Sequence, residues 1–129
     1  IGSKLLSVYA RPLSQDDHDT FTSILSFSNG SIASLIFSSE GDRPRVGKEQ
    51  ISVTTNGLSI DLFDFQRLII NNKVRRYRFA FDGSMETWDQ FISRPDYSSQ
   101  ISLSDGIHAT EVTLAIQESL KKNEEVLFT

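Results

Sequence analysis

The sequence of 129 residues contains no cysteine. Disulfides and thiolate chemistry are therefore excluded, and the absence is typical of proteins in a reducing compartment. No apolar run approaches the roughly 20 residues that a helix needs to cross a bilayer. The 7 glycines and 3 prolines do not gather into a linker or a low-complexity tract. We therefore expect a cytoplasmic protein with no membrane partner.

The composition is that of a folded domain, because hydrophobic residues make up 38% and charged residues 23% of the sequence. A chain of this length can bury a core without disulfides or metals, and we expect residues 1–129 to form a single domain. The sequence begins at Ile1, without an initiator methionine or a basic leader, and runs directly into an apolar stretch. We expect the domain to have been excised from a longer chain.

The formal net charge of −4 argues against a general nucleic-acid binder, which would normally carry a basic face. Residues 73–79 interleave cations with aromatics, as stacking surfaces do. In a strand, however, Arg75 lies on one face while Arg76 and Arg78 lie on the other, and this division is typical of an edge strand protected by cations. Nucleic-acid binding through these arginines is the least favoured alternative, and we expect no nucleic-acid partner.

The first two-thirds of the sequence alternate like antiparallel strands. Asn29-Gly30 is a strong signal for a two-residue hairpin turn. Such a turn places Phe27 opposite Ile32 and leaves both faces of the sheet partly apolar, which calls for a cover on each side. The other predicted strands are Lys4–Leu13, Glu49–Thr55, Leu58–Phe63, Arg67–Ile70 and Val74–Phe81, with further turns at Asn56-Gly57 and Asn71-Asn72.

Two helices are expected after the strands. Residues 84–92 favour a short helix, and residues from Ser102 onwards favour a long one. Ser102 and Asp105 have the spacing of a capping box, and Asn123 suits the left-handed position after a helix. The fold class predicted is α+β, with two layers: a largely antiparallel open sheet of about six strands and helices packed on one face.

No constellation of catalytic residues is apparent. The acidic run at residues 16–19 offers ligands for a metal, but His108 is distant and the run is better explained as a solvated turn. There is no nucleophile elbow, dinucleotide fingerprint or phosphate-binding loop. A half-buried helix edge is a better interpretation of His108 than a catalytic base. We therefore predict no catalytic, cofactor-binding or metal-binding residue in this chain.

Three segments together resemble the C-terminal domain of the Gfo/Idh/MocA oxidoreductases. They are the hairpin at residues 27–33, similar to F-x-N-G-S-x-A; residues 48–53 with 57–68, similar to K-E-x-I-E-V followed by I-D-D-F-R-x-L; and residues 104–120, similar to D-G-x-x-A-T followed by E-S. The likeness covers nearly the whole chain and is strongest to members linked to polysaccharide biosynthesis. Thr54-Thr55 departs from the family's F-G, which leaves the substrate open.

The resemblance implies a two-domain parent enzyme that uses NAD or NADP. Its Rossmann domain and its catalytic lysine and histidine lie outside this chain, so the chain should be inactive alone and hold no cofactor. The implied partners are its own N-terminal Rossmann domain, a sugar or nucleotide-sugar substrate, and further copies of itself that associate through the sheet face. A stand-alone protein-interaction module, using the same exposed sheet face, is the alternative.

The resemblance also implies the location of a substrate-contacting loop just before the strand that starts near Gln50. Lys48 and Glu49 occupy that location and could hydrogen-bond the hydroxyls of a sugar. Arg43 and Arg45, earlier in the loop, could meet a nucleotide-sugar phosphate. From the residues alone, a solvated loop with a neighbouring charge pair is the favoured explanation of Lys48 and Glu49.

Overall fold

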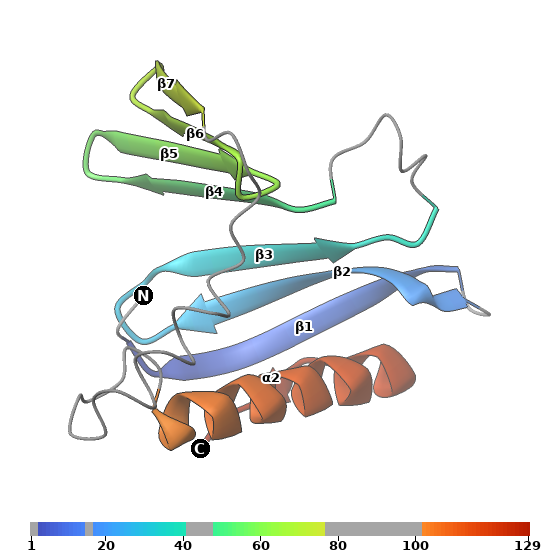
Figure 1. Ribbon diagram of the computed structural model, residues 1–129. Helices are drawn as coiled ribbons and strands as arrows, with labels where there is room; N and C mark the ends of the chain where they lie inside the picture. The colour runs from blue at the N-terminus through green and yellow to red at the C-terminus, as the bar shows by residue number, and fades with distance from the viewer. Residues whose placement is uncertain (1–2, 15–16, 41–47, 77–101) are drawn as a thin grey trace. The chain divides into compact units, whose positions relative to one another are not determined.

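The computed structural model describes residues 3–14, 17–40, 48–76 and 102–129 (Figure 1). They belong to two compact units: residues 1–40 with 100–129 form unit 1, and residues 41–99 form unit 2. Each unit contains a four-stranded antiparallel sheet. The predicted α+β class with antiparallel strands is confirmed, although the strands divide into two sheets of four rather than one sheet of about six. The helix predicted at residues 84–92 lies outside the described residues.

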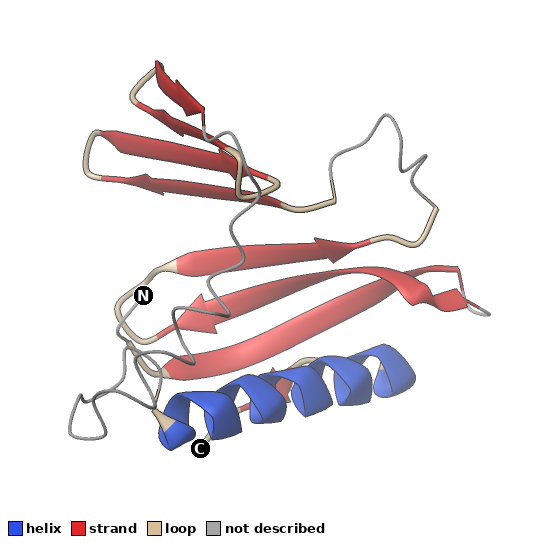
Figure 2. Ribbon diagram, viewed as in Figure 1, coloured by secondary structure: helices blue, strands red, loops and turns tan. Residues whose placement is uncertain are grey.

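Unit 1 consists of a sheet and a helix that covers one of its faces. The strand order is β3-β2-β1-β8, and Figure 2 shows α2 lying along β1. The elements are β1 (Leu5–Ser14), β2 (Asp17–Phe27), β3 (Ile32–Phe37), α2 (Leu103–Lys122) and β8 (Val126–Leu127). Among the described residues, no helix combines the length and the apolar character needed to span a membrane.

The core of unit 1 lies between β1 and α2. Its buried hydrophobic residues are Val8, Ala10, Ala115, Ile116 and Leu120. Val8 and Ala10 alternate along β1, and the helical residues recur on one face of α2, so each element presents one apolar side. Full burial of a valine, isoleucine or leucine contributes about 1.5–3 kcal/mol each. This packing fixes the helix against the centre of the sheet.

Helix α2 begins and ends as its sequence predicts. The Ser102 hydroxyl accepts a hydrogen bond from the Asp105 N–H at 3.2 Å, and the Asp105 carboxylate accepts one from the Ser102 N–H at 2.7 Å. The bond from the Ser102 backbone, helped by its hydroxyl, holds the pKa of Asp105 below its ordinary value of 3.8. Asn123 adopts a left-handed φ of 56° and donates to the Ser119 carbonyl at 2.7 Å.

The hairpin between β2 and β3 has a three-residue loop, so the predicted two-residue turn was wrong. Gly30 alone of the predicted turn pair has a positive φ, of 82°, and the Phe27 N–H donates to the Ser31 carbonyl. This is a turn followed by a glycine bulge. The extra residue shifts the pairing by one, so that Leu25 rather than Ser26 lies opposite Ala33 and Ser26 lies opposite Ile32.

The start of β2 also differs from the prediction of a solvated turn. Asp17, His18 and Asp19 lie within β2, and Asp17 pairs with Ser14 of β1. Pro12 lies inside β1, which runs one residue beyond the predicted strand Lys4–Leu13. It is accommodated because β8 pairs only with Ser7 and Val8, so β1 has no neighbour on that side at Pro12.

Unit 2 is a meander whose strand order is β4-β5-β6-β7. The strands are β4 (Gln50–Thr55), β5 (Leu58–Phe63), β6 (Arg67–Ile70) and β7 (Lys73–Arg76). The predicted two-residue turns at Asn56-Gly57 and Asn71-Asn72 are confirmed, because all four residues have positive φ. Asparagine and glycine tolerate this conformation better than other residues. These turns fix the register of the two outer hairpins.

The register gives the sheet of unit 2 two chemically different faces. One face, here called the polar face, carries Gln50, Ser52, Thr54, Ser59, Asp61, Phe63, Arg67 and Arg76, together with Ile69 and Val74. The other, here called the apolar face, carries Ile51, Val53, Leu58, Ile60, Leu62, Leu68 and Ile70, with Lys73 and Arg75 on β7. Sequence alternation alone separates these sets, because successive side chains of a strand point to opposite faces.

Candidate functional site

The described part of the chain was searched for side chains that could bind a ligand or a metal. It contains no group of three or more His, Asp or Glu side chains that could hold a metal ion. His108 is exposed on α2, and it contributes to lowering the pKa of Asp105 in the helix cap. A general base needs a partner that orients it and a pocket that receives substrate. Three places outside the core gather polar side chains, and each is described in turn.

The first place is the end of β4 where the resemblance implies substrate contact. Lys48 and Glu49 are both exposed there, immediately before β4 begins at Gln50. The backbone of Glu49 is fixed: its N–H donates to the Asp64 carboxylate at 3.0 Å, and its carbonyl accepts from the Asp64 N–H at 2.8 Å. The Glu49 side chain therefore extends from a backbone that two hydrogen bonds position. Arg43 and Arg45 lie outside the described residues.

The turn beside this loop end was not predicted from the sequence. Asp64 and Phe65 both have positive φ, 48° and 54°, and the Gln66 N–H donates to the Phe63 carbonyl at 2.9 Å. A left-handed phenylalanine is strained, and such strain occurs preferentially at functional positions. Phe65 is 41% exposed. An exposed aromatic side chain therefore follows directly after Asp64, the residue that is bonded to the backbone of Glu49.

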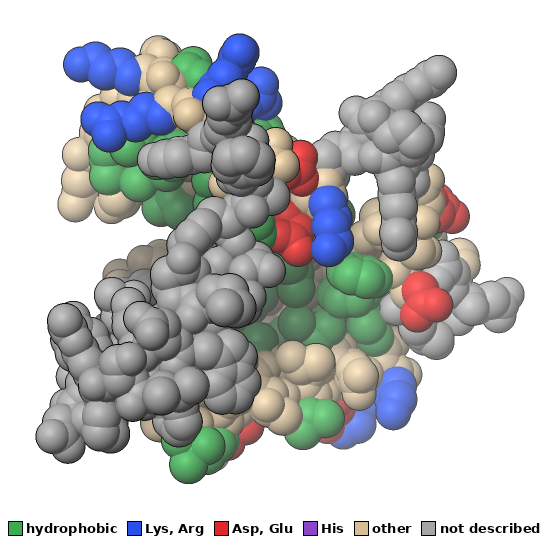
Figure 3. All heavy atoms as spheres, in the orientation of Figure 1, with side chains coloured by type: hydrophobic (Ala, Val, Ile, Leu, Met, Phe, Trp, Pro, Cys, Tyr) green, Lys and Arg blue, Asp and Glu red, His purple; other side chains and the backbone are tan. Residues whose placement is uncertain are grey.

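The second place is a row of side chains across the polar face of unit 2. Phe63 lies directly opposite Arg67, and Arg67 lies directly opposite Arg76. The Arg67 guanidinium lies over the Phe63 ring, 4.2 Å from its centre. Figure 3 shows lysine and arginine side chains gathered over β6 and β7. Sequence reasoning singled out Arg75 and Arg76 but missed Arg67, because only the register of β6 against β7 brings Arg67 and Arg76 together.

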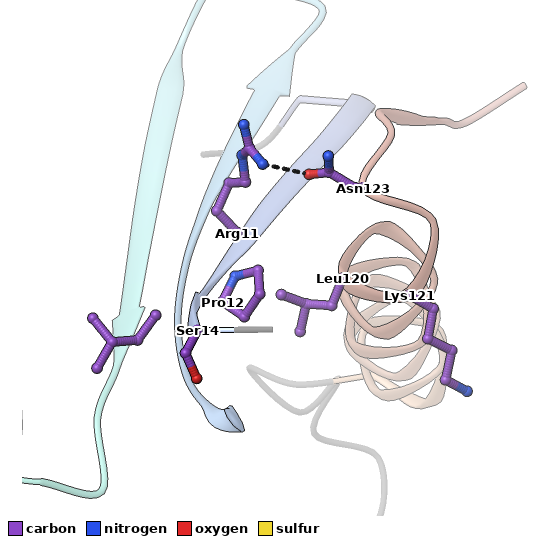
Figure 4. Close-up of a pocket in the computed structure, with 7 residues that line it drawn as sticks. Arg11, Pro12, Ser14, Leu120, Lys121 and Asn123 are labelled. Atoms are coloured by element: carbon purple, nitrogen blue, oxygen red, sulfur yellow. Dashed lines mark hydrogen bonds between the residues drawn. The ribbon is translucent and has the colours of Figure 1, made fainter. Parts of the chain in front are cut away.

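The third place is an open cleft in unit 1, of about 550 Å³, between the end of β1 and the end of α2 (Figure 4). Pro12 and Leu120 form its apolar side, and the Arg11 guanidinium donates to the Asn123 side-chain oxygen at 2.8 Å. Figure 4 shows Lys121 directed away from these residues. Arg11, a charged group of this cleft, is already bonded to the end of α2. We therefore interpret the cleft as a result of the packing of α2 on β1.

Comparison with solved structures identifies relatives of the fold. No protein-family model and no curated protein matches the chain. A Thermotoga maritima protein assigned as an oxidoreductase matches 98% of the chain, with a TM-score of 0.72 and 21% identity. The WlbA dehydrogenase from Bordetella pertussis, in complex with NADH and UDP-GlcNAcA, matches 97% with a TM-score of 0.69 and 17% identity. The chain spans only 42% and 39% of these two chains. At these identities the comparison establishes a shared fold.

Proposed function

We propose that this chain is the substrate-binding and oligomerisation domain of an NAD(P)-dependent sugar or nucleotide-sugar dehydrogenase of the Gfo/Idh/MocA type. The observation that carries the proposal is the match of 97% of the chain to only 39% of the WlbA dehydrogenase, a protein whose structure holds NADH and UDP-GlcNAcA. The sequence resemblance to the Gfo/Idh/MocA oxidoreductases is a second and independent support for the proposal. On this proposal a Rossmann domain, the dinucleotide and the catalytic lysine and histidine belong to the remainder of the parent chain.

The substrate side is assigned to the loop end before β4. Lys48 and Glu49 are exposed, the backbone of Glu49 is held by Asp64, and Phe65 adds an exposed aromatic ring. Charge-assisted bonds from these side chains would hold sugar hydroxyls. Arg43 and Arg45 remain candidates for the phosphate groups of a nucleotide sugar. Hydride transfer itself would be carried out by groups from the rest of the parent chain.

The oligomerisation role is assigned to exposed apolar sheet surface. On the face of the unit 1 sheet opposite α2, Ile24, Ile32 and Ile36 are 49%, 73% and 76% exposed. On the apolar face of unit 2, Ile51 and Val53 are 49% and 46% exposed. Contiguous apolar surface of this kind marks interaction sites in soluble proteins. Association of identical copies would bury it symmetrically.

The proposal is tested on the native gene product, purified from its source. We expect it to bind NAD(H) and to reduce NAD⁺ or NADP⁺ when a sugar, polyol or nucleotide sugar is added, as followed by the absorbance of the reduced cofactor. Replacing Lys48 with Ala should raise KM with little change in kcat, because Lys48 binds ground state and transition state alike. A native product that binds neither NADH nor NADPH would overturn the proposal.

A stand-alone protein-interaction module is the second candidate, and the same exposed isoleucines favour it. The two candidates differ in the native gene. A region that encodes a Rossmann domain upstream of Ile1 supports the dehydrogenase and removes the module. A gene that encodes this chain by itself does the reverse.

A further inference from the structure

The polar face of unit 2 places two arginines directly opposite each other. Arg67 on β6 pairs with Arg76 on β7, and side chains in such positions start about 4.5–5.5 Å apart at their Cβ atoms. Like charges directly opposite in a sheet are destabilising. Neither arginine forms an ion pair with any carboxylate of the described residues. No ion pair within that part of the chain therefore offsets the repulsion between them.

Protection of the sheet edge does not explain the pair. Cations on an edge strand discourage pairing with other chains, and β7 is an edge strand that carries Lys73, Arg75 and Arg76. Arg67, however, lies on β6, which has a strand on each side. A cation there does nothing for the edge, and it adds repulsion against Arg76.

The surroundings of Arg67 hold its guanidinium in one place. The Phe63 ring lies beneath it at 4.2 Å, so the side chain is ordered before any ligand arrives. Asp61, two positions from Phe63 on the same face, accepts a hydrogen bond from the Ser52 hydroxyl at 2.6 Å and forms no ion pair with either arginine. The N–H groups at the edge of the Arg67 guanidinium are thus left without a carboxylate partner among the described residues.

We propose that Arg67 and Arg76 form a site for the phosphoryl group of a small molecule, such as a diphosphate. Guanidinium groups present parallel N–H donors that match phosphate oxygens, and two guanidiniums on directly opposite residues can bind one dianionic group together. The ligand would remove the repulsion between the arginines as it binds. The site lies on the polar face and does not depend on the proposed function. Its residues differ from Lys48 and Glu49, so the phosphoryl site can be disproved while the proposed substrate role of Lys48 and Glu49 stands.

The test is a calorimetric titration of the 129-residue chain at low salt with inorganic pyrophosphate and, separately, with UDP. We expect binding of at least one, weakened about tenfold or more by Arg67→Gln and by Arg76→Gln, as for the loss of a charge-assisted bond. Arg75→Gln is the matched control, because it removes the same charge from the same strand on the opposite face. It should change affinity less than about threefold, the effect of a distant surface charge.

The two probes separate the sources of the phosphoryl group. Tighter binding of UDP indicates a nucleotide-borne diphosphate, and equal binding indicates that a bare phosphoryl anion is sufficient. Arg76→Lys keeps the charge but removes the parallel N–H donors of the guanidinium, and should also weaken binding of the probe. The proposal is overturned if neither probe binds at millimolar concentration or if Arg75→Gln weakens binding as much as Arg76→Gln. Tighter binding of a single-stranded oligonucleotide than of pyrophosphate, equally sensitive to Arg75 and Arg76, would also overturn it by showing a diffuse polyanion surface.

Discussion

The hydroxyl oxygen of Ser119 on α2 accepts a hydrogen bond from the backbone N–H of Ala10 on β1 at 2.9 Å, and both residues have no exposed surface. The bond replaces a missing strand. β8 pairs with Ser7 and Val8 but does not extend along β1 as far as Ala10. The N–H of Ala10 therefore has no strand partner on that side. The same hydroxyl donates to the Glu124 carbonyl just beyond the helix. One serine thereby joins the sheet, the helix and the segment that leads into β8.

The first prediction concerns Ser119. Ser119→Ala leaves a buried N–H and a partly buried carbonyl without partners, and should lower the free energy of unfolding by about 1–3 kcal/mol. Denaturant unfolding followed by circular dichroism measures this. Ser104→Ala, the same chemical change at an exposed position of α2, is the control and should stay within about 0.5 kcal/mol. Equal small effects for both variants would show that the hydroxyl does not join the two elements.

The second prediction concerns the bond that positions the loop end at Glu49. Asp64→Ala removes the acceptor of the Glu49 N–H and the tolerance of a left-handed φ, and should destabilise unit 2 by about 1 kcal/mol or more. Asp64→Asn keeps both properties and should be nearly neutral. Amide hydrogen exchange at Glu49 reports the bond directly. If exchange there is as fast in the wild-type chain as in Asp64→Ala, the bond does not hold the loop end.

The third prediction is a dependence of helix stability on pH. The pKa of Asp105 is lowered in the folded chain, chiefly by the Ser102 backbone N–H. A lowered folded pKa contributes stability that is present above the ordinary value of 3.8 and is lost as the pH falls through the folded pKa. Thermal unfolding should therefore show a loss below about pH 4 that is absent in Asp105→Asn. An identical acid profile in both chains would contradict the role given to the cap.

The fourth prediction concerns self-association. Ile36 is 76% exposed on the face of the unit 1 sheet opposite α2, so Ile36→Lys should place a charge in any interface formed there. Sedimentation velocity should show oligomers of the wild-type chain and a monomeric variant, because a buried unpaired charge is strongly unfavourable. Leu114→Lys, at a 59% exposed position of α2, is the control and should associate normally. A wild-type chain that stays monomeric at high concentration contradicts the oligomerisation role.

The parts of the fold that could be predicted depend on neighbours in sequence. The capping box of Ser102 and Asp105 and the turns at 56–57 and 71–72 are set by residues within a few positions of each other, and the structure confirms them. The turn at Asn29-Gly30 has the same local signal, yet its loop takes a third residue. Dipeptide preference does not fix the length of a loop. The predicted register of β2 against β3 was therefore wrong by one residue.

The features that could not be predicted depend on partners distant in sequence. Phe65 adopts a left-handed φ although its side chain disfavours it, because Asp64 is bonded to Glu49 on the neighbouring strand. Ser119 has the pattern of an ordinary helical serine, and its role becomes apparent only because the pairing of β1 with β8 stops at Val8 and leaves the N–H of Ala10 without a strand partner. The pairing of Arg67 with Arg76 likewise requires the register of β6 and β7. Lys48 and Glu49 were found through the family resemblance and lie beside this turn, and their part in substrate binding stays a prediction.

The mass of the native gene product tests the central proposal most directly. An antibody raised against this chain, used to blot an extract of the source cells, measures it. A dehydrogenase parent predicts a band larger than the 14.5 kDa of this chain by at least one further domain, roughly 100–200 residues. A band at about 14.5 kDa would contradict the proposal, because the chain would then work without a nucleotide-binding domain of its own.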